Sequence, residues 1–428
     1  MDQLNYFSVE NLYSFGKKVE FSMESTKEKS LRGNLIEING RLNLSPVAVL
    51  YGANASGKTN LIKSINMLKK LIITSATFQG GDEFPLLPFK LLEDKGTTFK
   101  IVFLSSGIKY LYYLKLNKER VLTEYLYESP KGRQAKIFHR TFNIEKNKYE
   151  YEYSKEKKGL FSSIEGKCLK NRLFFSVLAQ WTNISRVINP YMFFKNNLCT
   201  NGNRGSQLED LSSPAKLIEE NEEIKNLFLG IFEEINPGIV DIVSKGEKNK
   251  ILLEELSLDI PRELKIYMKE KEKKKNLLEL KTVYSNGMTL DFVEESQGVQ
   301  KIVKILIPII KILKEGGVLL LDELETTLYP IIGEKILSLF LNREINSKGA
   351  QIIFSTQDIN LLNFNILRKD QIWFLERTSE TEFMSTLYSL GSIKGIRKDE
   401  NIRKNYINGK YSRVPSFSNN SLESFFIK

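Results

Sequence analysis

The sequence is poor in the residues that build disulfide frameworks and histidine-centred sites. Only Cys168 and Cys199 are present, too few for a disulfide framework, which indicates a reducing compartment. The single histidine, His139, lies in a β-rich stretch away from any motif, and we expect it to be structural.

Long apolar runs are also missing. The longest candidate, Ile302–Leu313, contains Lys304 and Lys311 and is typical of a core helix. No run is long enough to cross a bilayer, and the N-terminus lacks a basic-then-apolar signal pattern. We therefore expect a cytoplasmic protein with no membrane partner.

The charge balance is basic. The 428 residues include 63 lysines and arginines and 52 aspartates and glutamates, for a net charge of +11. This balance favours a polyanionic partner such as nucleic acid, but a generally lysine-rich composition explains it equally well. The hydrophobic content of 41% is enough for a large core and predicts two or three structural units.

An α/β pattern occurs at both ends of the chain, with a different pattern between them. Val47–Gly52 is typical of a buried strand, and the following helix should place Leu61, Ile65, Leu68 and Leu71 on one side. Residues 99–153 predict an antiparallel meander. We predict three segments: residues 1–155 and 286–428 as the two parts of an α/β head, and residues 156–285 as a mainly helical insertion.

The stretch GANASGKT, Gly52 to Thr59, fits the pattern G-x-x-x-x-G-K-[ST] between an apolar strand and a helix. Glycines let backbone N–H groups close around phosphate oxygens, and the helix N-terminus adds partial positive charge. We expect Lys58 to reach the β- and γ-phosphates and the Thr59 hydroxyl to bind Mg²⁺. The alternative is a glycine-rich turn that binds nothing. The predicted nucleotide-binding residues are Gly52, Asn54, Ala55, Ser56, Gly57, Lys58, Thr59 and Asn60.

The stretch LLLDELETTLYP, Leu319 to Pro330, sets two carboxylates at the end of an apolar strand. Beside a phosphate loop, Asp322 is expected to hold Mg²⁺ through water, and Glu323 to orient or deprotonate the attacking water. The alternative is a carboxylate pair that caps the next helix.

A third motif, EESQGVQK, places Ser296 and Gly298 just before an apolar helix, which is a second potential anion site. It lies after the insertion and before the carboxylate strand, the order found in ABC-type and SMC-type ATPases. In those proteins the signature of one subunit caps the γ-phosphate held by the other. The alternative is an ordinary serine N-cap.

Together these motifs resemble the stand-alone SMC/ABC-type ATPases of the OLD-like and RloA/AriA group of bacterial anti-phage systems. The resemblance implies an α/β fold: an ABC/SMC-like P-loop ATPase head with an antiparallel β lobe and a helical insertion. It also implies ATP and Mg²⁺ as cofactors, and a homodimer formed through the ATP sites that could assemble further. The matching segments are FSVENLYSF, YGANASGKTNLIKSI, YLYYLKLNKERVLTEYLYE, EESQGVQK, LLLDELETTLYP, STQDINLL and RKDENIRKNYINGKYSRVP.

The sequence departs from this family at three positions. Gln357 replaces a histidine that normally touches the γ-phosphate, Val299 replaces the usual threonine, and Tyr329 replaces a histidine. Glutamine donates a hydrogen bond but cannot become cationic, so we predict slow ATP hydrolysis with Glu323 and Gln357 in the catalytic positions.

The resemblance implies a nucleotide-driven sensor or scaffold in anti-phage defence. No nuclease centre is apparent, so the effector should be a separate protein, such as a Toprim or RloB-like nuclease, or a toxin. One alternative is a DNA-binding repair ATPase of the RecF/SMC type. Another is a protein that binds ATP for assembly with little turnover.

Overall fold

The computed structural model describes residues 2–38, 40, 42–130, 132–154, 158–200, 221–236, 238–244, 280–292, 294–324, 330–397 and 399–413. The chain divides into two compact units, residues 1–202 with 312–428 and residues 203–311. The segment boundaries predicted near residues 155 and 285 stay predictions. Within the described ranges, no helix is long and apolar enough to cross a membrane.

The first unit contains a six-stranded sheet with the strand order β11-β15-β16-β5-β17-β18. Every neighbouring pair is parallel except β17 with β18. All residues of β5, β15 and β16 are buried, as expected for the near-continuous apolar strands of parallel sheets. The strands are β5 (Val47–Tyr51), β11 (Leu198–Thr200), β15 (Val318–Leu321), β16 (Gln351–Ser355), β17 (Ile372–Arg377) and β18 (Ser385–Ser389).

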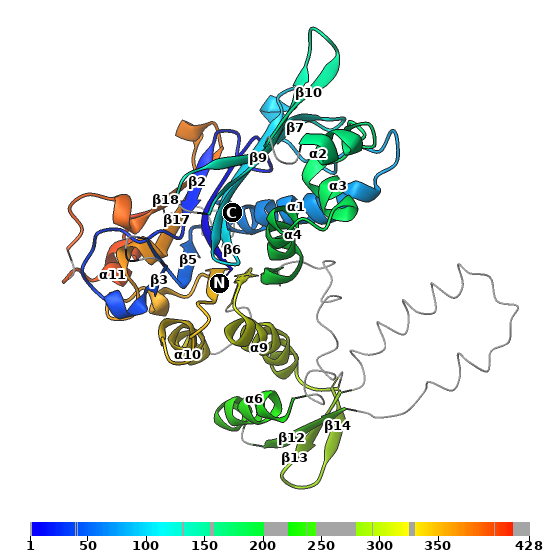
Figure 1. Ribbon diagram of the computed structural model, residues 1–428. Helices are drawn as coiled ribbons and strands as arrows, with labels where there is room; N and C mark the ends of the chain where they lie inside the picture. Colours follow the sequence, from blue (N-terminus) through cyan, green and yellow to red (C-terminus); the bar gives the residue numbers. More distant parts are fainter. Residues whose placement is uncertain are drawn as a thin grey trace, which may run out of the picture. The chain divides into compact units, whose positions relative to one another are not determined.

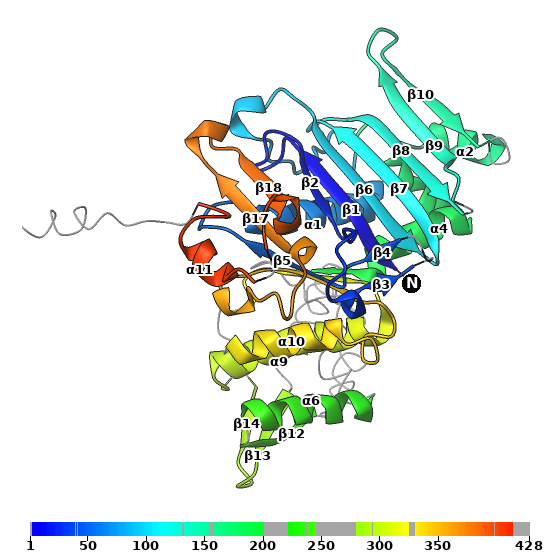
Figure 2. The same ribbon diagram turned by 90° about the vertical axis from the view of Figure 1, so that its left-hand side faces the viewer.

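The same unit contains a seven-stranded antiparallel sheet with the order β10-β9-β8-β7-β6-β1-β2 (Figure 2). It includes the predicted meander of residues 99–153, and the predicted α/β fold with an antiparallel lobe is confirmed. A short pair, β3 (Ile36–Glu37) and β4 (Asn43–Leu44), lies outside both sheets. The strands are β1 (Gln3–Glu10), β2 (Val19–Ser22), β6 (Thr97–Ser105), β7 (Ile108–Leu116), β8 (Val121–Ser129), β9 (Ala135–Asn143) and β10 (Lys148–Tyr153).

Helix α1 (Lys58–Thr74) follows β5 directly. The four residues predicted to share its apolar side, Leu61, Ile65, Leu68 and Leu71, are all buried in the core that contains the inner face of the antiparallel sheet. The other helices of this unit are α2 (Lys158–Glu165), α3 (Phe174–Trp181), α4 (Ser185–Met192) with a π-helical turn at Phe193–Asn197, α10 (Pro330–Leu341) and α11 (Ile402–Ile407).

A buried glutamate caps α3, and α3 in turn contacts the end of α1 through a pair of serines. The Glu124 carboxylate accepts the Phe174 and Phe175 N–H groups at 2.7 and 2.9 Å, so it caps the N-terminus of α3 from β8. Burial raises its pKa, and the buried Arg140, 3.8 Å away, opposes that rise. Ser75, just beyond α1, donates to Ser176 of α3 at 3.0 Å.

The second unit contains a three-stranded antiparallel sheet, and α6 lies along it (Figure 1). Lys225 of α6 pairs with Asp241 of β12 at 2.8 Å. The core helix expected at Ile302–Leu313 lies within α9, which begins in this unit. The elements are α6 (Glu222–Ile235), β12 (Ile239–Ser244), β13 (Leu280–Tyr284), β14 (Thr289–Asp291) and α9 (Gln297–Glu315).

Candidate nucleotide site

The phosphate loop, Gly52–Thr59, turns sharply between β5 and α1. Gly52 has φ +151° and Gly57 has φ +113°, both values that side-chain-bearing residues rarely adopt. A Cβ at Gly52 would lie 2.4 Å from the Leu375 carbonyl oxygen, and one at Gly57 would lie 2.5 Å from Ser385 Oγ. Ala55 also has a left-handed backbone conformation, with φ 64°. The glycines are therefore required by the fold of the loop.

Lys58 is the first residue of α1, and its side chain folds back over the phosphate loop. Only 8% of it is exposed, and its Nζ donates to the carbonyl oxygens of Gly52 at 2.6 Å and Ala53 at 3.1 Å. The N-cap of α1 is Gly57, which has no side chain to accept the first helical N–H groups. A cation and the first N–H groups of a helix that lacks a side-chain cap thus lie together at this turn, which suits a bound phosphate.

Three side chains hold the start of α1, and the sequence analysis missed two of them, Ser14 and Ser385. Asn60 Nδ2 donates to Ser14 Oγ at 2.8 Å, and Ser385 Oγ donates to the same oxygen at 2.7 Å. The Ser385 N–H also donates to the Ser14 carbonyl at 2.8 Å. Asn60 was predicted to bind nucleotide, whereas this geometry gives its amide a role in anchoring the helix.

The two carboxylates follow β15, which is separated from β5 by β16 alone. Ser355, the last residue of β16, donates to Asp322 Oδ1 at 2.6 Å and accepts the Glu323 N–H at 2.8 Å. Glu323 has a left-handed backbone conformation, with φ 53°. Glu323 is exposed, whereas Asp322 is half-buried. Ser355 is fully buried and fixes both carboxylate-bearing residues at once, a role that the sequence analysis did not assign.

Gln357 reaches the phosphate loop. Its Nε2 donates to Asn54 Oδ1 at 2.9 Å, and the preceding Thr356 N–H donates to the Leu50 carbonyl of β5 at 3.1 Å. Gln357, the position at which the resemblance expects a histidine, is therefore adjacent to the phosphate loop, and its amide contacts the Asn54 amide.

The closing helix α11 contacts the end of β5 and the turn that follows Gln357. The Tyr406 ring packs edge-on against Tyr51, the last residue of β5, with 5.6 Å between centroids. Burial raises the pKa of the Tyr406 phenol, and a hydrogen bond from the Gly52 N–H opposes that rise. Arg403 donates to the Asn360 carbonyl at 2.5 Å, in the turn that follows Gln357.

The signature residues lie in the second unit. Ser296 Oγ accepts the Val299 N–H at 3.3 Å, so the serine caps α9 as the alternative interpretation expected. The preceding Glu295 is buried and accepts the Tyr284 hydroxyl at 2.9 Å and the Thr282 hydroxyl, which anchors the motif to β13. A Cβ at Gly298 would have Ser296 Oγ as its nearest neighbour among the described residues, at 3.8 Å. Tyr329 lies outside the described residues.

The first unit supplies a donor set that fits Mg²⁺ with a nucleotide. It contains an ammonium on Lys58, a hydroxyl on the half-buried Thr59 and a carboxylate on Asp322. The buried Ser56 hydroxyl in the loop has no hydrogen-bond partner among the described side chains and backbone. No group of three or more His, Cys, Asp and Glu side chains in the described ranges could hold a metal alone. Magnesium commonly takes one or two protein ligands and completes its shell with phosphates and water.

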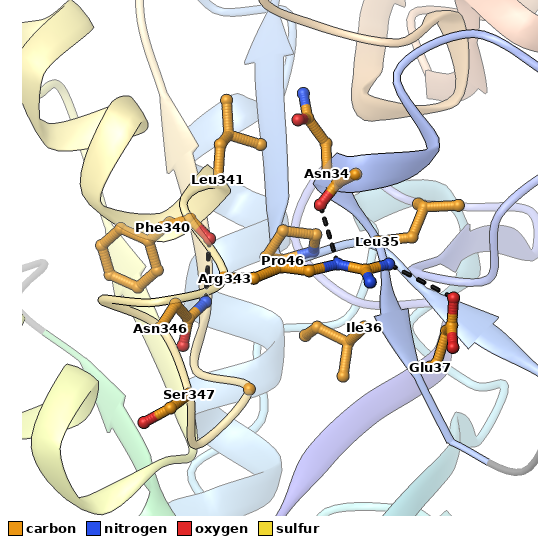
Figure 3. Close-up of a pocket in the computed structure, with 12 residues that line it drawn as sticks. Asn34, Leu35, Ile36, Glu37, Pro46, Phe340, Leu341, Arg343, Asn346 and Ser347 are labelled. Carbon is orange, nitrogen blue, oxygen red and sulfur yellow. Dashed lines mark hydrogen bonds and ion pairs between the residues drawn. The ribbon is translucent and has the colours of Figure 1, made fainter.

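A separate cavity of about 170 Å³ lies between the loop at residues 33–37 and the end of α10 (Figure 3). Arg343 spans it, donating to the Gly33 carbonyl at 3.0 Å and pairing with Glu37 at 3.3 Å. None of the predicted site residues lines this cavity, and its arginine ties the loop to α10.

A protein-family model described as "AAA domain, putative AbiEii toxin, Type IV TA system" matches residues 47–363. A comparison with curated proteins finds no match. Among solved structures, the SMC head domain from Thermotoga maritima is similar with 12% identity, 90% of this chain and 98% of that chain covered, and a TM-score of 0.39. The Smc head domain with a coiled coil and joint from Pyrococcus yayanosii is similar with 11% identity, coverage of 95% and 99%, and a TM-score of 0.38.

Proposed function

Because the chain belongs to this AAA-domain family of P-loop ATPases, which is described with the AbiEii toxins of type IV toxin–antitoxin systems, we propose that it is a slow, Mg²⁺-dependent ATPase that acts as a nucleotide switch in anti-phage defence. The family description and the resemblance to the OLD-like, RloA/AriA group support the same biological setting.

The observation that carries the proposal is the tie between the two carboxylates and the strand beside the phosphate loop. Ser355 holds Asp322 and Glu323 at the end of β15, while Gln357, two residues further on, contacts Asn54 of the loop. If the loop were only a glycine-rich turn that bound nothing, it would not need two carboxylates fixed at the end of β15, which is separated from β5 by β16 alone.

Each residue then has a defined task. Lys58 and the N–H groups at the start of α1 bind the phosphates, and Thr59 and Asp322 bind the metal ion, Asp322 through water. Bound Mg²⁺ supplies charge neutralisation at the phosphates. Glu323 orients a water molecule and accepts its proton, while Gln357 donates a hydrogen bond toward the γ-phosphate position in place of its contact with Asn54.

The signature supports a homodimer in which each site is completed by the partner. Glycine in a helical turn costs roughly 0.5–1 kcal/mol relative to alanine. Within the described part of the chain no close neighbour requires Gly298. A phosphate held by the partner's loop would need the open space beside Gly298 and would accept a hydrogen bond from the Ser296 hydroxyl. Closure on ATP and opening after hydrolysis would then control a separate effector, a Toprim or RloB-like nuclease or a toxin.

Gln357 favours slow turnover and also keeps a second candidate open, a protein that binds ATP for assembly with little hydrolysis. The net charge of +11 permits a third, a DNA-binding repair ATPase. Phosphate release that falls in Glu323→Gln supports hydrolysis at this site, while release equal to that of the unmutated chain would remove Glu323 from its assigned role.

Binding is tested first with Lys58→Ala, which should abolish ATP binding because the ammonium contacts the phosphates. Lys63→Ala, on the same helix, is the matched control and should bind normally. Retained tight binding in Lys58→Ala would contradict the site. Affinity capture with Glu323→Gln and ATP from the native host would then identify the effector, and capture of DNA with no effector protein would favour the repair ATPase.

A further inference from the structure

The outer face of the antiparallel sheet carries a row of tyrosines. Along β7 the side chains alternate: Tyr110 and Tyr112 are fully buried on the core side, whereas Lys109, Tyr113 and Lys115 lie on the opposite, outer side. The register places Tyr113 opposite Tyr125 of β8, and Tyr125 opposite His139 of β9. We call the outer side chains Tyr113, Tyr125, Tyr127 and His139 the tyrosine row.

The tyrosine row is a rigid aromatic platform. The Tyr113 and Tyr125 rings stack with centroids 4.7 Å apart and planes only 6° from parallel. Tyr127 and His139 each meet Tyr125 edge-on at 5.2 Å. Rings that support one another in this way lose little conformational freedom when a further planar group stacks on them.

A groove of about 300 Å³ borders Tyr113 and Tyr125, and most of its lining comes from β1, β6 and β7. These three strands are neighbours in the antiparallel sheet (Figure 2). The floor of the groove is made of short or flexible side chains, and Tyr113 and Tyr125 form its aromatic wall. The volume lies at the lower end of the range for small-ligand sites and is enough for one base with its sugar. The lining residues are Ser8, Val9, Glu10, Lys18, Thr98, Lys100, Tyr113 and Tyr125.

The charges around the wall are complementary to an anion. Lys18 is paired with Glu20 at 2.7 Å, and Lys136 is paired with Glu152. Lys100, Lys109 and Lys115 form no ion pair with any described acidic side chain. Three lysines without an ion pair therefore lie around the tyrosine row. Lys100 also lies over the Tyr6 ring at 5.6 Å and attracts the Glu20 carboxylate, and Glu10 lines the groove.

The lysines are also correctly placed along the strands. Lys100 is directly opposite Tyr113 in the register of β6 with β7. Lys109 and Lys115 lie on the same face of β7, roughly 13 Å before and 7 Å after Tyr113 at the usual rise of a strand. A chain that stacks a base on Tyr113 would therefore meet a cation on each side of that base.

We infer that the tyrosine row and its groove bind single-stranded nucleic acid. Bases stack on Tyr113 and Tyr125, phosphates contact Lys100, Lys109 and Lys115, and the Glu10 carboxylate accepts a hydrogen bond from a base N–H. Stacking on a protein ring requires an unstacked base, which a single strand offers and an intact duplex does not. The inference is independent of the proposed ATPase function.

The test is fluorescence anisotropy of a labelled single strand of about 12 nucleotides, as DNA and as RNA, on the full chain without nucleotide. The same sequence as a duplex is the comparison. Tyr113→Leu should weaken single-strand binding roughly tenfold, because base–aromatic stacking is lost, while Tyr113→Phe keeps the ring and should bind as well as the unmutated chain. Lys115→Met should reduce the slope of log affinity against log salt by about 0.7. Lys404→Met, on α11, should leave the slope unchanged.

Equal affinity of Tyr113→Leu and Tyr113→Phe, or no single-strand binding at all, would overturn the inference. Tighter binding to the duplex would point to phosphate contacts on another surface. Capture of a protein partner that depends on Tyr113, with no nucleic-acid binding, would make this face a protein interface instead. ATP binding measured on each variant shows whether it is folded, and its loss in every protein would refute the ATPase proposal alone.

Discussion

At the scale of single residues, Ser355 should matter for hydrolysis more than for binding. Its hydroxyl donates to Asp322 and accepts the N–H of Glu323, so Ser355→Ala leaves both carboxylates less well positioned. A hydrogen bond to a charged group is worth roughly 1.5–3 kcal/mol, so we expect phosphate release to fall at least about tenfold. ATP affinity, measured by calorimetry, should change little.

Ser338→Ala is the matched control for this variant, because Ser338 is exposed on α10 and donates to the Lys335 carbonyl of its own helix. It should hydrolyse ATP normally. If Ser355→Ala also hydrolyses ATP normally, then Ser355 does not position the carboxylates.

The sequence suggested candidate residues for this site but not the contacts that hold them. Gly52 and Gly57 could be predicted because a phosphate loop requires backbone conformations that glycine adopts at low cost. Ser14 and Ser355 could not, because a hydroxyl in a loop or at a strand end gives no sign of its partner. Ser14 meets Asn60, 46 positions along the chain. The residue types therefore indicate the chemistry of the site, whereas the contacts between residues that are distant in the sequence depend on the fold.

At the scale of elements, α11 should position the nucleotide site from the C-terminal side. Arg403 donates to the Asn360 carbonyl and Tyr406 accepts the Gly52 N–H. Each contact is one hydrogen bond of about 1 kcal/mol, so Arg403→Met should slow phosphate release roughly fivefold with little change in ATP affinity. Tyr406→Phe should weaken ATP binding by a similar factor.

Lys404→Met is the control on the same helix, because Lys404 is exposed. It should behave like the unmutated chain. Arg403→Lys should restore part of the loss, because a lysine can still donate to a carbonyl. Parallel losses of rate and affinity in all variants, Lys404→Met included, would mean that α11 only stabilises the fold.

The segment around α11 should loosen in acid. Glu400 accepts hydrogen bonds from Lys410 and Tyr411 at 2.8 and 2.7 Å, and these contacts lower its pKa to about 2 from an ordinary value of 4.5. A lowered pKa means that the folded state prefers the carboxylate. This stabilisation is complete above pH 4.5 and is lost as the pH falls toward 2.

Hydrogen exchange of the α11 amides, corrected for the intrinsic pH dependence, should therefore accelerate between these two pH values. In Glu400→Gln the acceleration should be absent, and exchange should already be fast at neutral pH. Glu344→Gln, at an exposed position in the same unit, is the control. Identical profiles for Glu400→Gln and the unmutated chain would contradict the role given to this carboxylate.

The docking of α11 could not be predicted from the sequence, although its segment was quoted in the family resemblance. Its contacts with β5 and β17 are aromatic: Tyr406 stacks on Phe374 with 5.5 Å between ring centroids. Tyrosines at helical spacing predict a buried face without naming the strand that the face covers. The antiparallel meander was easier to predict, because alternation and short turns between β6 and β10 identify it locally.

At the scale of the whole molecule, complementation should reveal composite sites. Lys58→Ala disables the phosphate loop and Ser296→Arg disables the signature, so each homodimer should be inactive. A mixed dimer has one site in which both defects meet and one site that is intact. A random equal mixture should therefore recover about a quarter of the normal rate in a homodimer with two equivalent sites.

In the control, one of the two single variants is replaced by a double variant that carries both Lys58→Ala and Ser296→Arg. This mixture should recover no activity. No recovery in either mixture would mean that each chain completes its own site or that the signature is not used.

The strand order carries one more consequence. The phosphate loop leaves β5, yet both neighbours of β5 in its sheet, β16 and β17, come from residues 351–377. A ribosome adds roughly 5–20 residues per second, so β5 emerges on the order of half a minute before its neighbours exist. Until then β5 has no neighbouring strand, and the carboxylates at residues 322 and 323 are translated only shortly before β16. A truncated or stalled chain would thus be unable to bind ATP, and a cell that carries this protein would be protected from premature activity by the order of its own translation.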